Sequence, residues 1–198
     1  MTNREEQKQN TRGKLLAAAA LCFAEKGYSG CSIAEIAKRA EVAQGTMYVH
    51  FKSKEALFKA MIEEEHAQGS EKARRAAGMT PYLTGILSVM TDCIRDVGFP
   101  VDHRLWTEIL AVAARDPSVR EAFAASDKAM RAVFVELLHK AAEAGEIDGS
   151  LDFDAVSVWL YALVDGLIAR TADDPGFDFQ KHLHVFEVLV RRALCPQK

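Results

Sequence analysis

The hydrophobic positions of this chain recur at intervals of three and four residues, which is the spacing of one face of an α-helix. Gly, Pro and helix-capping residues interrupt the pattern, and no alternating run is long enough to indicate a strand. We therefore predict an all-α fold of about nine helices. Besides two short helices within residues 32–51, helices are expected at about 9–26, from 53 into a long polar continuation, and at about 81–98, 104–114, 117–144, 152–171 and 179–194.

Residues 31–57 predict two short helices joined by a tight turn and followed by the start of a longer helix. Ser32 and Glu35 have the spacing of a capping box, in which each side chain satisfies a free backbone N–H. The next helix begins near Ala43 and places Met47 and Phe51 on its inner side. This outline is typical of a helix-turn-helix that reads DNA.

The outer face of the second short helix carries no acidic residue, so it can lie against a polyanion without repulsion. Gln44 stands at the exposed first turn, where its amide can pair with adenine through two hydrogen bonds. Gly45 lets the backbone approach closely, and the remaining side chains of suitable type can contact phosphates. These phosphate-contacting residues are Thr46, Tyr48 and His50.

Ser53 is a good N-cap for the following helix, yet Lys52 and Lys54 flank it. Two cations at this end oppose the helix dipole. The arrangement becomes favourable if a phosphate docks on the free backbone N–H groups. We therefore add both lysines to the predicted DNA contacts, together with Ser32.

These residues together resemble the N-terminal signature of the TetR family of bacterial transcriptional regulators, over residues 15–58. The matching positions are Gly27, Tyr28, Ser32, Ile36, Ala37, Val42, Gly45, Thr46, Tyr48, His50, Phe51, Lys54, Glu55 and Leu57. Residues 104–167 resemble, less closely, one common ligand-domain subtype of that family.

Two positions depart from the family pattern. Glu41 stands where the turn usually has Gly, at a cost of roughly 1–2 kcal/mol if the backbone there is left-handed. Ala43 replaces the usual Ser or Thr cap of the reading helix, which removes about 1 kcal/mol of capping and one phosphate contact. The departures affect the expected affinity and leave the class unchanged.

The resemblance implies a helix-turn-helix DNA-binding domain at 1–58 and a ligand-binding and dimerisation domain at 59–198. It further implies a repressor that binds a pseudo-palindromic double-stranded DNA operator as a homodimer and is released by a small, largely apolar effector. Activation instead of repression is a second outcome. The alternative class is a helical protein-interaction module without specific DNA binding.

Apolar residues cover nearly the whole circumference of the helix expected at 152–171, so all its sides should be buried. In a domain of this size, one side should face another chain; a core helix in a monomer is the alternative. In the resembled family the last two helices form a four-helix dimer interface. The corresponding residues here are Trp159, Leu163, Leu167, Phe186, Leu189 and Val190.

Aromatic and methionine side chains lie on the helices that bound the effector pocket in similar proteins, although such residues also commonly fill cores. The candidates for lining the pocket are Tyr82, Met90, Trp106, Phe123, Met130, Phe134 and Trp159. Arg104, Glu108 and Arg131 could orient a polar group of the ligand, or lie on solvated faces.

Charge is divided unevenly along the chain. Residues 1–58 hold nine Lys and Arg against six Asp and Glu, whereas residues 59–198 hold sixteen against twenty-two. A basic first part on an acidic remainder is expected when one end meets DNA, although a net charge of +3 can also be ordinary scatter.

Other chemistry is not indicated. The four cysteines lack a short CxxC pairing, so free thiols are expected, and the histidines have no metal-ligand spacing. The isolated His66, His103 and His139 should be surface residues. No catalytic or cofactor motif was found, which argues against an enzyme and predicts no metal or cofactor. Without a signal-like or uninterrupted membrane-length apolar run, the chain is expected to be cytoplasmic.

Overall fold

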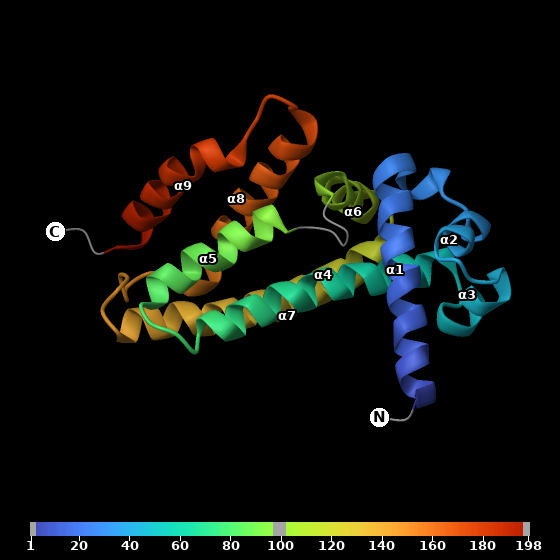
Figure 1. Ribbon diagram of the computed structural model, residues 1–198. Coiled ribbons are helices and arrows are strands. Elements are labelled where there is room, and N and C mark those ends of the chain that lie inside the picture. Colours follow the sequence, from blue (N-terminus) through green and yellow to red (C-terminus); the bar gives the residue numbers. More distant parts are fainter. Residues whose placement is uncertain (1–2, 97–101, 196–198) are drawn as a thin grey trace. The chain divides into compact units, whose positions relative to one another are not determined.

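A computed structural model describes residues 3–96 and 102–195 of the chain. Within these residues the regular structure consists of nine helices and no strand, as predicted (Figure 1). The helices are α1 (Asn3–Gly30), α2 (Ile33–Arg39), α3 (Gln44–His50), α4 (Lys54–Ala76), α5 (Tyr82–Arg95), α6 (His103–Arg115), α7 (Pro117–Glu143), α8 (Phe153–Asp173) and α9 (Phe179–Leu194).

Most helix ends follow local chemistry that the sequence announces. The side chains of Ser32, Asp116 and Asp152 accept hydrogen bonds from backbone N–H groups in the first turns of α2, α7 and α8. Gly145, with φ of 71°, follows the end of α7 in the left-handed conformation that glycine adopts without strain. These ends were therefore correctly predicted.

Two predicted starts were wrong. Helix α1 begins at Asn3 instead of near Gln9, because its first turns are helical without an apolar stripe to reveal them. At α5 the cap is Pro81 and not Thr80. The free Leu83 N–H is satisfied from far along the chain, since the Glu146 carboxylate accepts its hydrogen bond at 2.7 Å.

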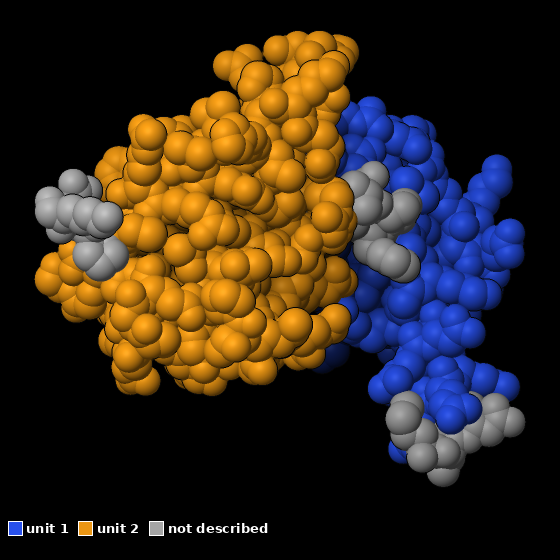
Figure 2. All heavy atoms as spheres, turned by 60° about the vertical axis from the view of Figure 1, so that its left-hand side comes forward, with its two compact units in different colours: residues 1–64, 98–123 blue, residues 65–97, 124–198 orange. Residues whose placement is uncertain are grey.

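The chain divides into two compact units (Figure 2). Unit 1 comprises residues 1–64 and 98–123, and unit 2 comprises residues 65–97 and 124–198. Unit 1 includes α6, which packs against α1. The units thus divide the chain differently from the predicted functional domains 1–58 and 59–198, and that division stays a prediction about function.

Unit 1 is organised around a buried aromatic cluster. The ring of Phe23 in α1 meets that of Phe58 in α4 edge-on, with centroids 5.2 Å apart, and Tyr28 lies 4.8 Å from Phe58. Both phenylalanines are fully buried. Such contacts hold α1 against the start of α4.

Cys22 and Cys31 are joined in a disulfide, so the prediction of four free thiols was wrong for this pair. Cys22 lies on the inner side of α1, and Cys31 follows the bend at the end of that helix. The bend brings their Cα atoms to 6.1 Å, although neither residue belongs to a short CxxC motif.

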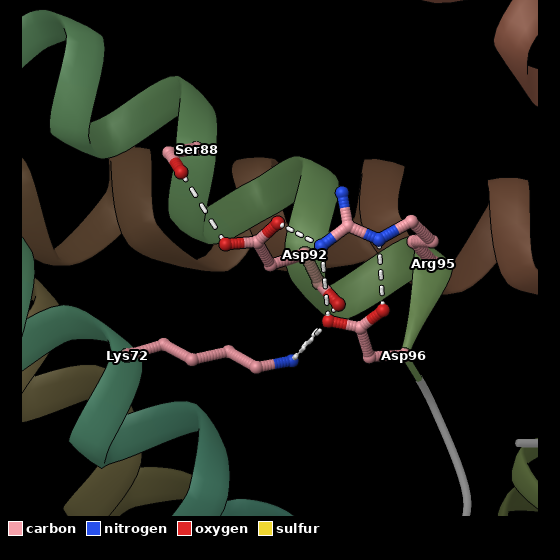
Figure 3. A network of polar contacts seen from close by, with 5 residues as sticks. All are labelled: Lys72, Ser88, Asp92, Arg95 and Asp96. Carbon is pink, nitrogen blue, oxygen red and sulfur yellow. Dashed lines mark hydrogen bonds and ion pairs between the residues drawn. The ribbon is translucent and has the colours of Figure 1, made fainter.

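In unit 2, α5 packs against α8 and α9. A polar network ties α5 to α4 (Figure 3). Lys72 of α4 donates to the Asp92 carbonyl at 2.8 Å, and its ammonium lies 3.7 Å from the Asp96 carboxylate. Arg95 bridges the Asp92 and Asp96 side chains. The cations Lys72 and Arg95 thereby neutralise two acids at the carboxyl end of α5, where acids are otherwise unfavourable.

Candidate nucleic-acid interface

The turn between α2 and α3 is closed by backbone hydrogen bonds. Glu41 N–H donates to the Lys38 carbonyl at 3.2 Å and Val42 N–H donates to the Ala37 carbonyl at 3.0 Å, the two bonds of a Schellman motif. The motif requires a left-handed residue, and Glu41 has φ of 57°. The predicted strain at Glu41 is therefore present.

The inner side of α3 is anchored by Met47, which is fully buried. Phe51, also buried, closes the helix as its C-cap. At the other end Ala43 is the N-cap and provides no side-chain hydrogen bond, as expected from its methyl group. The burial of one side orients α3 and turns its other side to solvent.

That outer side presents the predicted DNA-contacting residues. Gln44 and Gly45 are exposed, Tyr48 is 52% exposed, and Thr46 is half-buried at the margin. A Cβ added at Gly45 would meet no atom within 4 Å, so the surface above this residue is open. The structure thus brings the four residues together on one accessible face.

His50 ends α3 beside two cations from α1. Burial lowers the pKa of His50, and the nearby Lys8 and Arg12 lower it further. The Arg12 guanidinium lies 5.5 Å above the Phe51 ring centroid. Sequence reasoning missed both cations as neighbours of the reading helix, because they lie about forty residues earlier in the chain.

The two lysines predicted to contact phosphates, Lys52 and Lys54, have different surroundings at the start of α4. The Ser53 hydroxyl accepts from Ala56 N–H at 3.0 Å, which confirms the predicted cap, and the exposed Lys52 stands beside it. The ammonium of Lys54 instead bonds the backbone carbonyls of Tyr28 (2.8 Å) and Cys31 (3.0 Å).

The geometry of Lys54 shows a structural role, and its predicted phosphate contact stays a prediction. Its ammonium also lies 4.4 Å from the centroid of the Tyr28 ring. The bend of α1 at Gly27, where φ is 72°, leaves carbonyl groups without helical partners, and Lys54 satisfies them. Lys54 is therefore a structural residue of unit 1.

The other face of the same bend is held by α6. Tyr28 N–H donates to the Glu108 carboxylate at 2.5 Å. Glu108 was predicted as a possible partner of a ligand or a solvated residue, and the structure gives it this structural contact instead. The bend that precedes α2 is thus held by side chains from α4 and α6.

Two family models match this chain. A model described as bacterial regulatory proteins of the tetR family matches residues 15–61, which include α2, α3 and the start of α4. A model described as the C-terminal part of BetI-type transcriptional repressors matches residues 87–194, more than half of the chain. The chain belongs to the TetR family of bacterial regulators. This TetR-family protein is therefore a DNA-binding transcriptional regulator.

Individual relatives are similar along nearly their whole length. The HTH-type transcriptional repressor AcnR of Corynebacterium diphtheriae is 27% identical over 187 residues, covering 92% of each chain. A TetR-family regulator from a Rhodococcus species has the same fold with a TM-score of 0.80 at 22% identity, covering 92% of this chain and 97% of its own. FadR of Bacillus subtilis, solved with stearoyl-CoA, has a TM-score of 0.76 at 22% identity, covering 89% and 96%.

The predicted effector-lining residues of this TetR-family regulator fall into two sets. Trp106 and Phe123 belong to unit 1, where their ring centroids lie 5.9 Å apart. The others belong to unit 2, where Met90, Met130 and Phe134 are buried and Tyr82 is half-buried. Their lining role stays a prediction. The seventh, Trp159, is 77% exposed, so it cannot line an enclosed pocket of the single chain.

The predicted dimer residues are also divided by burial. Trp159, Leu163 and Leu189 are exposed, and Leu167 is half-buried. Phe186 and Val190 are buried inside unit 2, at 4% and 2% exposure. These two therefore cannot contact a partner copy, because they occupy the inner side of α9, where Phe186 meets Phe179 with ring centroids 5.7 Å apart.

Sequence reasoning missed Tyr161 and misplaced His66. The Tyr161 hydroxyl is buried and has no hydrogen-bond partner among the described residues, and burial raises the pKa of Tyr161 well above its ordinary value. His66, predicted at the surface, is 2% exposed and its Nδ1 lies 2.7 Å from the Ser126 hydroxyl. The apolar pattern of the sequence gave no sign that a polar atom is buried at either position.

Among residues 3–96 and 102–195, no group of three His, Cys, Asp or Glu side chains could hold a metal ion. By length and composition, α8 is the one described helix that could cross a membrane. A single helix of this kind is weak evidence for a membrane span, since interface and core helices of soluble proteins have the same composition.

Proposed function

We propose that this TetR-family protein is a repressor that binds a pseudo-palindromic operator as a homodimer and is released by a small, largely apolar effector. The observation that carries the proposal is the outer face of α3. Gln44, Gly45 and Tyr48 are exposed there without an acidic neighbour in the helix, while Met47 fixes the helix from behind. The name of its relative AcnR supports repression over activation.

Each residue of this face has a chemical role in the proposal. The Gln44 amide reads a base edge, most favourably adenine, in the major groove. Tyr48 and Thr46 hydroxyls and the exposed Lys52 contact phosphates, and His50 contributes a neutral N–H donor because its pKa is lowered. Ser32, exposed as the cap of α2, is the remaining proposed contact.

Dimerisation follows from an exposed apolar surface on α8 and α9, which we name the α8–α9 face. It consists of Val158, Trp159, Leu163, Val185 and Leu189, which are 39–77% exposed. Exposed large apolar side chains of this kind favour an interaction surface. A second copy of the chain is the proposed partner, since two-fold symmetry supplies two reading helices for two half-sites.

The effector is proposed to bind within unit 2, against the Tyr161 hydroxyl. A buried hydroxyl without a partner costs free energy, and a ligand acceptor group would remove that cost. Buried Phe134, whose ring centroid lies 5.3 Å from that of Tyr161, supplies an apolar wall. The fold can accept such ligands, since FadR holds stearoyl-CoA.

A mobility-shift assay on the DNA flanking the coding region tests the proposal. Wild type should prefer this DNA over competitor DNA, and Gln44→Ala and Tyr48→Ala should each weaken binding by about 1–3 kcal/mol, or roughly 5- to 150-fold. Gln180→Ala, an exposed glutamine at the start of α9, serves as the matched control and should bind like wild type. A wild-type protein without sequence preference would refute DNA-specific regulation.

The rival class is a helical protein-interaction module, favoured by the same α8–α9 face. The two classes differ in which substitutions matter. A module would keep its activity after Gln44→Ala and lose it after substitution of Trp159, whereas a dimeric repressor would lose operator binding with either.

A further inference from the structure

The first two turns of α1 project from unit 1, with their side chains exposed. All side chains at residues 4–10 are exposed, and Figure 1 shows this end of α1 extending beyond α2 and α3. Arg4, Lys8 and Arg12 are spaced by four residues, so they lie along one side of the helix. We name these three residues the α1 basic stripe.

The stripe is continuous with the reading surface. Lys8 and Arg12 both lower the pKa of His50 at the end of α3. The Arg12 guanidinium also lies over the ring of Phe51, the C-cap of that helix. Arg12 also forms an ion pair with Glu64, in which a guanidinium nitrogen lies 3.8 Å from a carboxylate oxygen. Within the described parts of the chain, Arg4 and Lys8 form no ion pair, so their charges are available to an external anion.

Two acidic residues, Glu5 and Glu6, lie in the same turns as the α1 basic stripe. Glu6 lies on the opposite side of the helix from Arg4, because two residues correspond to about 200° of rotation. Glu5 lies three residues before Lys8, within the range of a side-chain pair on the helix surface. Glu5 therefore places a negative charge near Lys8.

We propose that Arg4 and Lys8 bind phosphates of the operator duplex outside the groove that α3 reads, so that each protomer covers a longer stretch of DNA than its helix-turn-helix alone. The proposal rests on the proposed DNA-binding function. Duplex DNA is the fitting partner because clustered, unpaired cations beside a reading helix gain by releasing condensed counterions.

The test compares an Arg4→Ala/Lys8→Ala variant with wild type on the same upstream DNA, by hydroxyl-radical footprinting and by binding across a range of salt concentrations. Alanine preserves the helix. The variant should lose backbone protection at the two outer edges of the footprint and keep the central protection. For a dimer, which loses four phosphate contacts, the salt slope should fall by about 3 to 4, and affinity at low salt should fall roughly tenfold or more.

The matched control is Arg74→Ala/Lys128→Ala, which removes the same charge from exposed positions of unit 2 and should behave like wild type. Glu5→Gln should strengthen binding. A variant with an unchanged footprint and salt slope would overturn this proposal and leave the proposed function standing. Loss of central protection together with the edge protection would also overturn this proposal. A wild-type protein that footprints nowhere would overturn the proposed function, and this proposal with it.

Discussion

At the scale of single residues, the role of a charged side chain depends on which groups its backbone position brings within reach, more than on its charge. Lys52 and Lys54 flank the same cap, yet Lys52 is exposed while Lys54 bonds two backbone carbonyls at the bend of α1. Unpaired carbonyls at a helix end attract the nearest cation, because the partial negative charge there favours it. Two lysines on either side of one serine thereby have different contacts.

This difference can be measured with two substitutions. Lys54→Met should lower the free energy of unfolding by about 1–3 kcal/mol, because two partly buried carbonyls lose a charged donor. Lys52→Met should leave stability within about 0.5 kcal/mol of wild type and make operator binding less salt-dependent. Urea unfolding and salt-dependent DNA binding measure the two effects. The reverse pattern would favour Lys54 over Lys52 as the phosphate contact.

His66 makes stability depend on pH. Burial lowers its pKa from 6.5 to about 4, so the unfolded state binds a proton more readily than the folded state. Its contribution is fully present above pH 6.5 and is lost as the pH falls toward 4, by about 3 kcal/mol in total.

Urea unfolding between pH 4 and pH 7 checks this prediction. His66→Gln should flatten the pH dependence in that window, even if the variant is less stable overall. His184→Gln, at an exposed position of α9, should leave the slope unchanged. An equal slope in wild type and His66→Gln would show that other groups cause it.

At the scale of elements, the turn between α2 and α3 combines correct geometry with an unfavourable residue. The Schellman hydrogen bonds are formed, but they place Glu41 at φ of 57°, a conformation in which a Cβ meets the following carbonyl. The turn type was therefore readable from its place in the motif, whereas its cost comes from this one residue.

Glu41→Gly should relieve the strain and raise the free energy of unfolding by up to about 1 kcal/mol, because the relief exceeds the added entropy of glycine in the unfolded chain. The same substitution at Glu63, an exposed position within α4, should lower it by about 1 kcal/mol. Thermal or urea unfolding measures both. Destabilisation at both positions would contradict the assignment of strain.

At the scale of the whole molecule, the proposed homodimer rests on one apolar surface, the α8–α9 face. Trp159, at 77% exposure, is the largest apolar side chain of the α8–α9 face. Full burial of such a side chain contributes several kcal/mol, and aromatic residues dominate the energetics of interfaces. The proposed repressor requires this surface to be covered by a second copy.

Trp159→Glu should convert the dimer into a monomer in sedimentation experiments and should weaken operator binding strongly. The control is Met79→Glu, which places the same charge at a 68%-exposed apolar residue outside α8 and α9 and should leave the dimer intact. A dimer that survives Trp159→Glu would rule out this face as the interface.

The sequence by itself determined the helices, most of their ends and the family, because helical periodicity, caps and turn glycines act over a few residues. It also predicted which side of α3 is exposed, since Met47 and the outward residues recur at helical spacing within one helix. It missed the first turns of α1, which carry no apolar stripe, and it missed the cations beside His50, which lie about forty residues earlier in the chain.

Only the tertiary structure decided which side of an apolar helix is inside. Phe186 and Val190 pack within unit 2 while Leu189, between them, is exposed, although all three are apolar residues of one short segment. The same holds for the disulfide of Cys22 with Cys31, the burial of His66, and the Lys54 and Glu108 contacts at the bend of α1. Each depends on which elements meet in space, and local patterns of hydrophobicity and charge do not encode those meetings.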